Sequence, residues 1–405
     1  MTQRSILFVD DSVVQLESLQ RSLRPMCREW EMCFVDSGAA ALELMARSRF
    51  DVVVTDMLMP EMDGAELLEE VAKLSPETVR IVLSGCQSDR EAVLRTVRPA
   101  HRYLSKPCPP EELRTALNRT FALMDLLNNE AVKKAVSQLK TVPSLPSLYL
   151  AILEELRSRD PSIVRIGKII AQDMGMSAKI LQLVNSAAFC LRNEVSQPAH
   201  AVQLLGLDTV QALVLTVHVF SELDTALFRP GELAWLWNHS VSTSRFAKAI
   251  ADKEKVPERL SNQCFMAGLL HDVGKLILAA AFGKQYRAVL DAASTRKIGI
   301  VTAEQELLGC THAEAGAYLL GIWGLPHAII EAVAWHHRPS ESQVTTFSAL
   351  AAVHIASTCY ESMHPSPLGD QAQPDQVFLQ KLGLENRYPT WAQSCSTLEW
   401  EKQND

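Results

Sequence analysis

The stretch SILFVDDS (residues 5–12) decides the fold of the N-terminal part of the chain. An apolar run from Ile6 to Val9 ends in two aspartates, and the serine that follows is a favoured helix cap. Similar β-branched runs recur over residues 32–35, 52–55, 79–83 and 102–104, and amphipathic stretches begin near Ser12, Ser37, Gly64, Ser88 and Pro110. This alternation predicts an α/β doubly wound domain over residues 1–124, with a five-stranded parallel sheet covered by helices on both faces.

A long amphipathic stretch follows this domain. From residue 111 to about 140 the apolar residues step by three or four with no Pro or Gly, which predicts one continuous helix. This helix either pairs with a second copy in a homodimer or packs on its own chain. Pro143 and Pro146 end it. We therefore place the first domain at 1–124, a linker helix at 125–141, a second domain at 142–365 and a tail at 366–405.

The second domain is predicted to be all-α. Residues 147–363 form one amphipathic segment after another, separated by turn signals and without a convincing alternating strand pattern. Single helices are expected over 262–282 and 303–320, among others.

Composition and charge exclude several classes of protein. The 405 residues are 47% hydrophobic and 21% charged, which rules out a disordered chain. Residues 1–124 carry 15 basic and 19 acidic groups and the remainder 24 and 28, so each part has a net charge of −4 and nucleic acid is not an expected partner. Nine cysteines without a CxxC pair predict neither disulfides nor structural zinc. No apolar run is long enough to cross a membrane, and a cytoplasmic location is expected.

Polar residues stand at the carboxyl ends of the predicted strands. The first strand leads to Asp10 and Asp11, the third to Asp56, the fourth to Ser84 and the fifth to Lys106. In an open parallel sheet these ends meet at one crevice. Clustered carboxylates repel one another, Mg²⁺ relieves that repulsion, and a lysine can pair with phosphoryl oxygens. The set therefore predicts acyl-phosphate formation on Asp56. Each residue alone could be a helix cap or a turn residue, but such roles would not explain why four separate segments carry suitable polar groups at the same edge of the sheet.

This N-terminal part resembles the receiver domain of two-component response regulators. The resemblance is carried by VDDS (9–12), DMLMPEMDG (56–64), LSG (83–85) and YLSKP (103–107). It implies a flavodoxin-like fold and phosphorylation of Asp56 by a sensor histidine kinase or phosphotransfer protein. It also implies Mg²⁺ on Asp10, Asp11, Asp56 and the Leu58 carbonyl, a coordinated shift of Ser84 and Tyr103, phosphate contact by Lys106, and a cis Lys106–Pro107 bond.

Histidines gather in the second domain, on several predicted helices. The candidate set is His239, His271, Asp272, His312, His336, His337 and His354. Histidine and aspartate facing one bundle interior can bind a transition metal and activate water, and Lys275, one turn after His271, could meet a phosphate. The alternative is that these histidines are hydrogen-bonded core residues.

LLHDVGKL (269–276) resembles the HD-type metal-dependent phosphohydrolases. In that superfamily a late aspartate completes the metal site, but Ser357 stands at the expected position here. His354 and Glu361 flank it on the same helical face, and Glu361 is expected to point to solvent. A metal-dependent phosphohydrolase or cyclic-dinucleotide phosphodiesterase controlled by the first domain is therefore the alternative reading, and neither hydrolysis nor a bound transition metal is expected.

The second domain also resembles the HDOD domain, an HD-like helical relative usually regarded as having lost hydrolase activity. The resemblance is carried by SLPSL (144–148), QDMGMSAKILQLVNSAAF (172–189), AVQLLGLDTV (201–210), FMAGLLHDVGKL (265–276) and HAEAGAYLLGIWGLPHAIIEAVAWHH (312–337). It implies a two-component response regulator that signals through a protein-interaction output domain to an unidentified downstream protein. The eight residues from His239 to His354, Lys275 included, would then be a vestigial site.

Overall fold

The computed structural model describes most of the chain. The described residues are 3–85, 99–126, 129–137, 142–144, 151–152, 154–156, 158, 160–185, 195–207, 210, 220–222, 224–323, 325–368 and 373–404. The helix expected near Ser88 lies outside them, as do five of the ten residues of the amphipathic segment 148–157.

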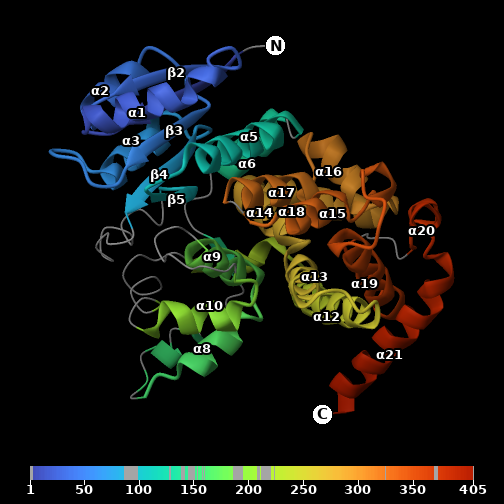
Figure 1. Cartoon of the computed structure of the whole chain (residues 1–405). Helices are drawn as coiled ribbons and strands as arrows, with labels where there is room; N and C mark the ends of the chain where they lie inside the picture. The colour runs from blue at the N-terminus through green and yellow to red at the C-terminus, as the bar shows by residue number, and fades with distance from the viewer. Residues whose placement is uncertain are drawn as a thin grey trace.

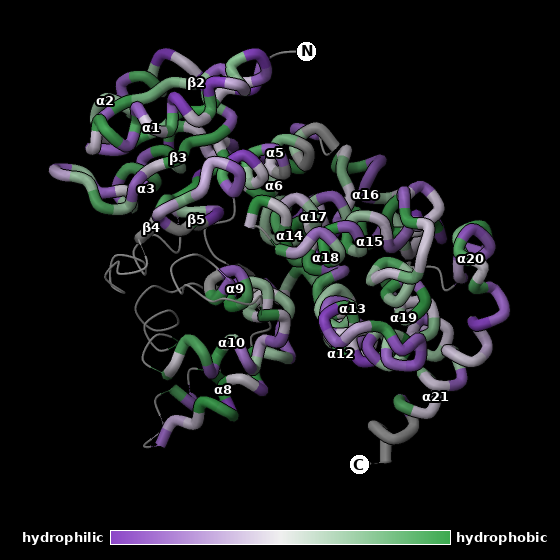
Figure 2. Tube along the Cα trace, viewed as in Figure 1, coloured by the Kyte–Doolittle hydropathy of each residue, from purple (hydrophilic) through white to green (hydrophobic). Residues whose placement is uncertain are grey.

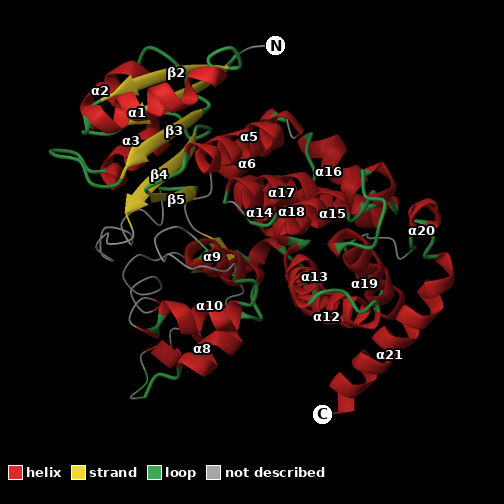
Figure 3. Cartoon of the chain, in the orientation of Figure 1, coloured by secondary structure: helices red, strands yellow, loops and turns green. Residues whose placement is uncertain are grey.

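The N-terminal domain is a five-stranded parallel sheet with helices on both faces (Figures 1 and 3). The strand order is β2-β1-β3-β4-β5, with every neighbouring pair parallel, so the order reverses between β1 and β3. The strands are β1 (Arg4–Val9), β2 (Trp30–Val35), β3 (Val52–Asp56), β4 (Val79–Gly85) and β5 (Arg102–Lys106). The helices are α1 (Val13–Leu23), α2 (Gly38–Met45), α3 (Gly64–Leu74) and α5 (Pro110–Leu126). The predicted fold of this domain is confirmed.

Alternate strand residues enter two apolar cores. Phe8 and Val54 face the core on the α1 and α5 side, whereas Leu7 and Val53 face the core that includes α3. Both faces of the sheet are therefore shielded from water, which explains why these strands are apolar throughout. Side chains cap the helices at the edge of the sheet: Ser12 accepts from the Gln15 amide and begins α1 directly after the aspartate pair.

The C-terminal domain is a helical bundle (Figure 1). A first group contains α8 (Ile163–Ile170), α9 (Met174–Val184) and α10 (Pro198–Leu205). The main group contains α12 (Glu232–Lys253), α13 (Glu258–Leu270), α14 (Val273–Phe282), α15 (Lys284–Arg296), α16 (Ile300–Leu308), α17 (His312–Ile322), α18 (His327–Trp335) and α19 (Ala349–Met363). The tail forms α20 (Gln376–Leu382) and α21 (Tyr388–Asn404), which packs on α12 and α19. Two three-residue strands, β6 (Val142–Ser144) and β7 (Phe220–Glu222), pair in parallel, although no strand was expected within 147–363.

Three helices predicted to be continuous are interrupted, so those predictions were wrong. The stretch 111–140 divides into α5 and α6 (Glu130–Ser137), and the Asn129 side chain accepts from the Ala131 amide where α6 begins. The stretch 262–282 divides at His271–Asp272, and 303–320 divides at Gly309, which is left-handed (φ +73°). Side-chain capping and a left-handed glycine end a helix without disturbing the spacing of its apolar residues, which is why periodicity missed the breaks.

The interrupted segment Glu258–Phe282 is apolar enough to cross a membrane by length and composition. An 18-residue window of this segment has a mean hydropathy of 1.5, but 78% of that window is buried inside the protein. The two helices it forms, α13 and α14, are core helices, and Figure 2 shows the hydrophobic character of α14.

The two domains share one continuous apolar core. Helix α6 packs against α14 and α17 through Val132, Ala135 and Val136, and α17 also contacts α5. A polar contact joins the domains as well, because Gln182 Nε2 on α9 donates to the His101 carbonyl at 2.7 Å. Of the two alternatives for the linker, the structure shows packing on its own chain.

Helices α14 and α17 approach so closely that one glycine has no room for a side chain. A Cβ on Gly274 would lie 1.8 Å from the His312 carbonyl oxygen and 2.9 Å from the Gly316 nitrogen. We expect Gly274→Ala to lower the free energy of unfolding by at least about 3 kcal/mol, because backbone atoms must move. Urea unfolding measures the loss. The matched control is Gly299→Ala, whose Cβ meets nothing within 4 Å and which should change stability by less than about 1 kcal/mol. Equal effects of the two variants would contradict this packing.

Lys179 is a buried cation beside the domain contact. It is 5% exposed, its ammonium lies 4.9 Å from the Trp323 ring centroid, and burial lowers its pKa to about 7. The unfolded chain, with an ordinary lysine pKa near 10.4, keeps this proton between pH 7 and 10 whereas the folded chain loses it, so stability rises with pH across that window. We expect Lys179→Met to stabilise the protein by on the order of 2 kcal/mol at pH 6.5 and by less at pH 9.5. Urea unfolding at both pH values, with the exposed Lys168→Met as control, tests this; a gain independent of pH would contradict it.

Candidate functional site

Three carboxylates of the N-terminal domain meet at the carboxyl edge of its sheet. Asp10 and Asp11 follow β1 and Asp56 ends β3, the two strands between which the order reverses. One carboxylate oxygen from each lies within 4.8 Å of the others. Asp10 is buried and Asp11 is exposed, so the group opens to solvent on one side. Such a set of oxygen ligands suits Mg²⁺, which keeps several of its waters.

Lys106, at the end of β5, joins two of these carboxylates. Its ammonium donates to Asp10 Oδ2 at 2.7 Å and lies 2.8 Å from Asp56 Oδ1. The backbone supplies further donors, since Asp10 Oδ1 accepts from the Ser12 amide and Asp56 Oδ1 from the Met57 amide. Burial raises the pKa of Asp56 above its ordinary value, and Lys106 opposes that rise. Asp56 therefore sits in a partly desolvated position with a fixed cation at one oxygen.

Gly64 shapes the backbone next to Asp56. A Cβ at this position would lie 2.2 Å from the Asp56 carbonyl oxygen, and the Gly64 amide donates to the Met57 carbonyl. The chain can return this close to the strand end only with glycine there.

The structure places the other predicted receiver residues less completely. The side chain of Leu58 is 57% exposed in the loop after β3. Ser84 lies in β4 and Tyr103 in β5, but their side chains fall outside the described part of the structure. The predicted cis bond at Lys106–Pro107 is present.

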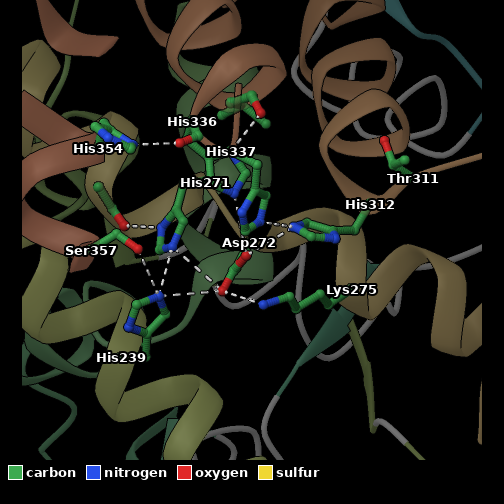
Figure 4. A network of polar contacts seen from close by, with 12 residues as sticks. His239, His271, Asp272, Lys275, Thr311, His312, His336, His337, His354 and Ser357 are labelled. Atoms are coloured by element: carbon green, nitrogen blue, oxygen red, sulfur yellow. Dashed lines mark hydrogen bonds and ion pairs between the residues drawn. The ribbon is translucent and has the colours of Figure 1, made fainter. Parts of the chain in front are cut away.

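In the helical domain, the predicted histidines gather around one carboxylate (Figure 4). His239 comes from α12, His271 and Asp272 from the α13–α14 junction, and His312 from the start of α17. His336 and His337 follow α18. Their ligand atoms form two groups that share Asp272: one with His239 and His271, the other with His312, His336 and His337.

Asp272 is neutralised by two cations. Lys275 Nζ donates to its Oδ2 at 3.0 Å, and both side chains are 1% exposed. His312 lies between two acids: its Nε2 is 3.3 Å from Asp272 Oδ1, and its Nδ1 is 2.7 Å from Glu304 Oε2. Burial acts to lower the pKa of His312, but these two acids raise it to about 9. Burial acts to raise the pKa of Asp272, but His271, Lys275 and His312 together hold it well below its usual range. Lys275, a candidate for phosphate contact, is buried and paired with Asp272.

Two other histidines are fixed by their outer nitrogens. His271 Nδ1 lies 2.7 Å from the Gly268 carbonyl and His336 Nδ1 2.8 Å from the Val333 carbonyl. A carbonyl only accepts, so each Nδ1 carries the proton and each Nε2 presents a lone pair toward Asp272. Burial lowers the pKa of both rings and keeps them neutral. Metal-ligating histidines characteristically make this outer hydrogen bond.

The site also holds atoms whose polar capacity is unmet. His336 Nε2 and His239 Nδ1 are buried and have no hydrogen-bond partner among the described residues, whereas Asp272 Oδ1 has His312 Nε2 at 3.3 Å. Buried polar atoms without partners are uncommon in native proteins.

Helix α19 carries Ser357, the position at which HD-type phosphohydrolases have their late aspartate. Ser357 is present as expected, 3.4 Å from His239 Nε2. Glu361 is 5% exposed; its Oε1 accepts from Ser357 Oγ at 3.0 Å and lies 3.7 Å from His239 Nε2. The prediction that Glu361 faces solvent was therefore wrong, because α19 packs on α12 and Glu361 faces His239 there. His354 is a structural residue, with Nδ1 donating to the His336 carbonyl and Nε2 accepting from the Asp375 amide.

Glu304 is a member of this polar site that the sequence analysis missed, since it contacts His312. In a continuous helix it would lie more than two turns from His312, but the left-handed Gly309 turns the chain so that the two meet. Gly309 was the signal in the sequence: a helix break placed at this glycine would have allowed Glu304 to approach His312.

The two halves match two known domain families. The response regulator receiver domain matches residues 6–118, and the HDOD domain matches residues 142–339. The chain belongs to the response regulators and combines an N-terminal receiver domain with a C-terminal HDOD domain. The HDOD match does not favour the alternative of a phosphohydrolase.

Similar proteins were found among both curated sequences and solved structures. The response regulator MprA of Mycobacterium leprae is 36% identical over 184 residues, which cover 42% of this chain and 79% of that protein. An uncharacterised protein of Treponema pallidum is 26% identical over 247 residues, covering 61% of this chain and 46% of its own length. The MmoQ response regulator of Methylococcus capsulatus is 22% identical, with a TM-score of 0.47 over 63% of this chain and 99% of that chain. The chain spans less than half of the first curated relative.

The pair Asp272–Lys275 offers a test of the charge balance in the helical domain. In the presence of a metal chelator, Asp272→Asn should lower the free energy of unfolding by about 3–5 kcal/mol, because it leaves the buried Lys275 ammonium without its carboxylate. Adding Lys275→Met to Asp272→Asn should cost less than the two single changes together, with a coupling of about 1–3 kcal/mol in a double-mutant cycle. Additive losses would show that the two charges do not depend on one another.

Proposed function

We propose that this chain is a phosphorylation-controlled regulator in which Asp56 accepts a phosphoryl group and the HDOD domain acts as the output. The observation that carries the proposal is the Lys106 ammonium, which contacts both Asp10 and Asp56 in a group of three carboxylates at the switch point of the sheet. A cation fixed between carboxylates is what an incoming phosphoryl group needs in order to approach an acidic site.

The reaction is a transfer onto a carboxylate oxygen. Asp56 Oδ1 accepts from Lys106 and Met57, which leaves Oδ2 to attack phosphorus. The bond from phosphorus to the donor's imidazole nitrogen breaks as the acyl-phosphate bond forms, and the donor histidine leaves with the electron pair. Lys106 then pairs with a phosphoryl oxygen in place of the Asp56 carboxylate charge.

Asp10, Asp11, Asp56 and the Leu58 carbonyl would hold Mg²⁺. When bound, this ion neutralises charge on the phosphoryl oxygens during transfer. Ser84 and Tyr103 are proposed as the residues that respond to the phosphoryl group, and the donor is a sensor histidine kinase or a phosphotransfer protein.

The route to the output domain runs through α5 and α6. Both helices pack on α17, and α6 also packs on α14. Helix α17 begins at His312 and α14 begins directly after Asp272, so a displacement of α5 or α6 bears on the polar site of the HDOD domain. Coupling requires that the phosphorylated receiver favour one arrangement of this contact, through which a downstream signalling protein is bound or released.

The proposal is tested by phosphorylating the full chain with acetyl phosphate and Mg²⁺. Intact mass spectrometry should show a gain of one phosphoryl group that hydroxylamine removes, as expected of an acyl phosphate. Asp56→Asn should abolish the gain, because an amide is not a nucleophile, and Asp10→Asn should reduce it at least about 10-fold by weakening the Mg²⁺ site.

The matched control is Asp63→Asn. Asp63 caps α3 outside the group of three carboxylates, and asparagine caps equally well, so phosphorylation should be unchanged. Modification that persists in Asp56→Asn would overturn the assignment of the phosphoacceptor. Hydrogen exchange that is unchanged in α14 and α17 on phosphorylation would overturn the proposed route between the domains.

A further inference from the structure

We propose that Cys359 and Cys395 form a reversible disulfide when the protein meets hydrogen peroxide, so that oxidation fixes the C-terminal helix α21 on α19. Neither cysteine belongs to the polar sites described above, and no CxxC motif marks the pair in the sequence. Both lie beyond residue 339, where the HDOD match ends. The proposal does not depend on phosphorylation at Asp56.

The two thiols meet where α19 packs on α21. Cys359 is 2% exposed on α19, and Cys395 is fully buried on α21. Their side chains are hydrogen-bond partners, so one sulfur lies against the other. A disulfide requires its two sulfurs to approach from facing backbones, and the packed helices α19 and α21 provide that arrangement.

The register of α21 holds Cys395 opposite Cys359. Tyr388 and Cys395 are seven residues apart, so their side chains lie on one side of the helix. The Tyr388 hydroxyl is also a hydrogen-bond partner of Cys359. Trp391 lies on the same side between them; it is fully buried, and its Nε1 donates to Glu254 Oε1 at 2.9 Å. Several contacts therefore fix the position of the second thiol.

The contact makes Cys359 the more readily ionised of the two thiols. Hydrogen bonds from the Cys395 thiol and the Tyr388 hydroxyl lower the pKa of Cys359, although burial acts to raise it. The same contact raises the pKa of Cys395. By contrast, burial raises the pKa of Cys264 and of Cys310 to about 12. The thiolate is the reactive form, so oxidation begins at Cys359.

The reaction consumes one hydrogen peroxide for each disulfide. The Cys359 thiolate attacks a peroxide oxygen, the O–O bond breaks, and the sulfur is oxidised to a sulfenic acid while hydroxide leaves and takes up the proton that the thiol lost. The Cys395 sulfur then attacks the sulfenic sulfur. The S–S bond forms as the S–O bond breaks, and the Cys395 proton leaves with that oxygen in a second water.

Entry of the oxidant requires α21 to open. Both sulfurs are buried, but α21 packs on the protein by one face, and Thr390, Gln393 and Thr397 on its other side are exposed. A helix held by one face is the kind of element that opens locally while the rest of the protein stays folded. The sulfenic acid forms in the open state, and reclosure of α21 brings Cys395 to it.

Oxidation bears on the polar site of the HDOD domain through α19. Ser357 and Glu361 of this helix contact His239, whereas Cys359, between them in the sequence, contacts α21. One side of α19 thus belongs to the histidine site and the opposite side to the thiol pair. A covalent bond to α21 restrains α19 directly behind Ser357 and Glu361.

The test is treatment of the reduced full chain with hydrogen peroxide, in a Cys27→Ser background that removes an exposed competing thiol. After free thiols are alkylated, intact mass spectrometry should show two fewer alkyl groups on the oxidised protein than on the reduced one, and dithiothreitol should restore both. Peptide mapping should identify the link between Cys359 and Cys395. No disulfide, or a disulfide between other cysteines, would overturn the proposal.

Serine variants in the same background separate the roles of the two thiols. Cys395→Ser should abolish the disulfide and leave a sulfenic acid on Cys359 that dimedone traps, whereas Cys359→Ser should leave little label on Cys395. The matched control is Cys264→Ser, which changes a buried thiol on α13 and should leave the disulfide unchanged. Equal dimedone labelling in the two variants of the pair would contradict the assignment of Cys359 as the first site of attack.

Hydrogen exchange measures what the disulfide does to the fold. In the oxidised parent, amide exchange in α21 should slow at least about 10-fold, because the bond to α19 removes the open state of the helix. Peroxide-treated Cys395→Ser should show no such protection. Disulfide formation that leaves exchange in α21 unchanged would overturn the proposal that oxidation fixes this helix.

Discussion

A carboxylate buried among several helices must be neutralised where it stands, because water cannot reach it and its desolvation is costly. Asp272 is in this position, and its neutralising partners come from different parts of the bundle. Lys275 belongs to the helix that Asp272 begins, and His312 begins the neighbouring helix α17. Since these side chains must converge, the starts of α14 and α17 lie in close contact, and only glycine fits at position 274. Much of the helix packing in this domain follows from that one charge.

The receiver domain solves a similar problem at its surface. Parallel strands end at the same edge, so Asp10 and Asp56 are brought together by topology, and Lys106 from β5 lies between them. The difference is exposure: Asp11 is open to solvent in the receiver, whereas the Asp272 group is enclosed. The first arrangement leaves its carboxylates accessible from solvent, and the second does not.

The sequence predicted what is local or periodic. The strands of the receiver and the residues at their ends followed from short apolar runs, and the histidines of the helical domain followed from their motif. Periodicity could not locate the breaks at Asn129 and His271, because side-chain and backbone hydrogen bonds end helices there without changing the apolar spacing. Glu304 and Glu361 were misjudged for a related reason. The position of Glu304 depends on a turn at Gly309, and the burial of Glu361 depends on the packing of α19 against α12.

The apolar core that passes from the receiver through α6 into α14 and α17 limits how far the two domains are interchangeable. Val132, Ala135 and Val136 belong to the linker, yet they complete the core of the output domain. Cutting the chain before residue 142 would expose apolar surface on both sides of the cut. A receiver from another regulator would have to bring a linker shaped to the same two helices. The two domains are therefore expected to evolve as a matched pair and to unfold as a single cooperative unit.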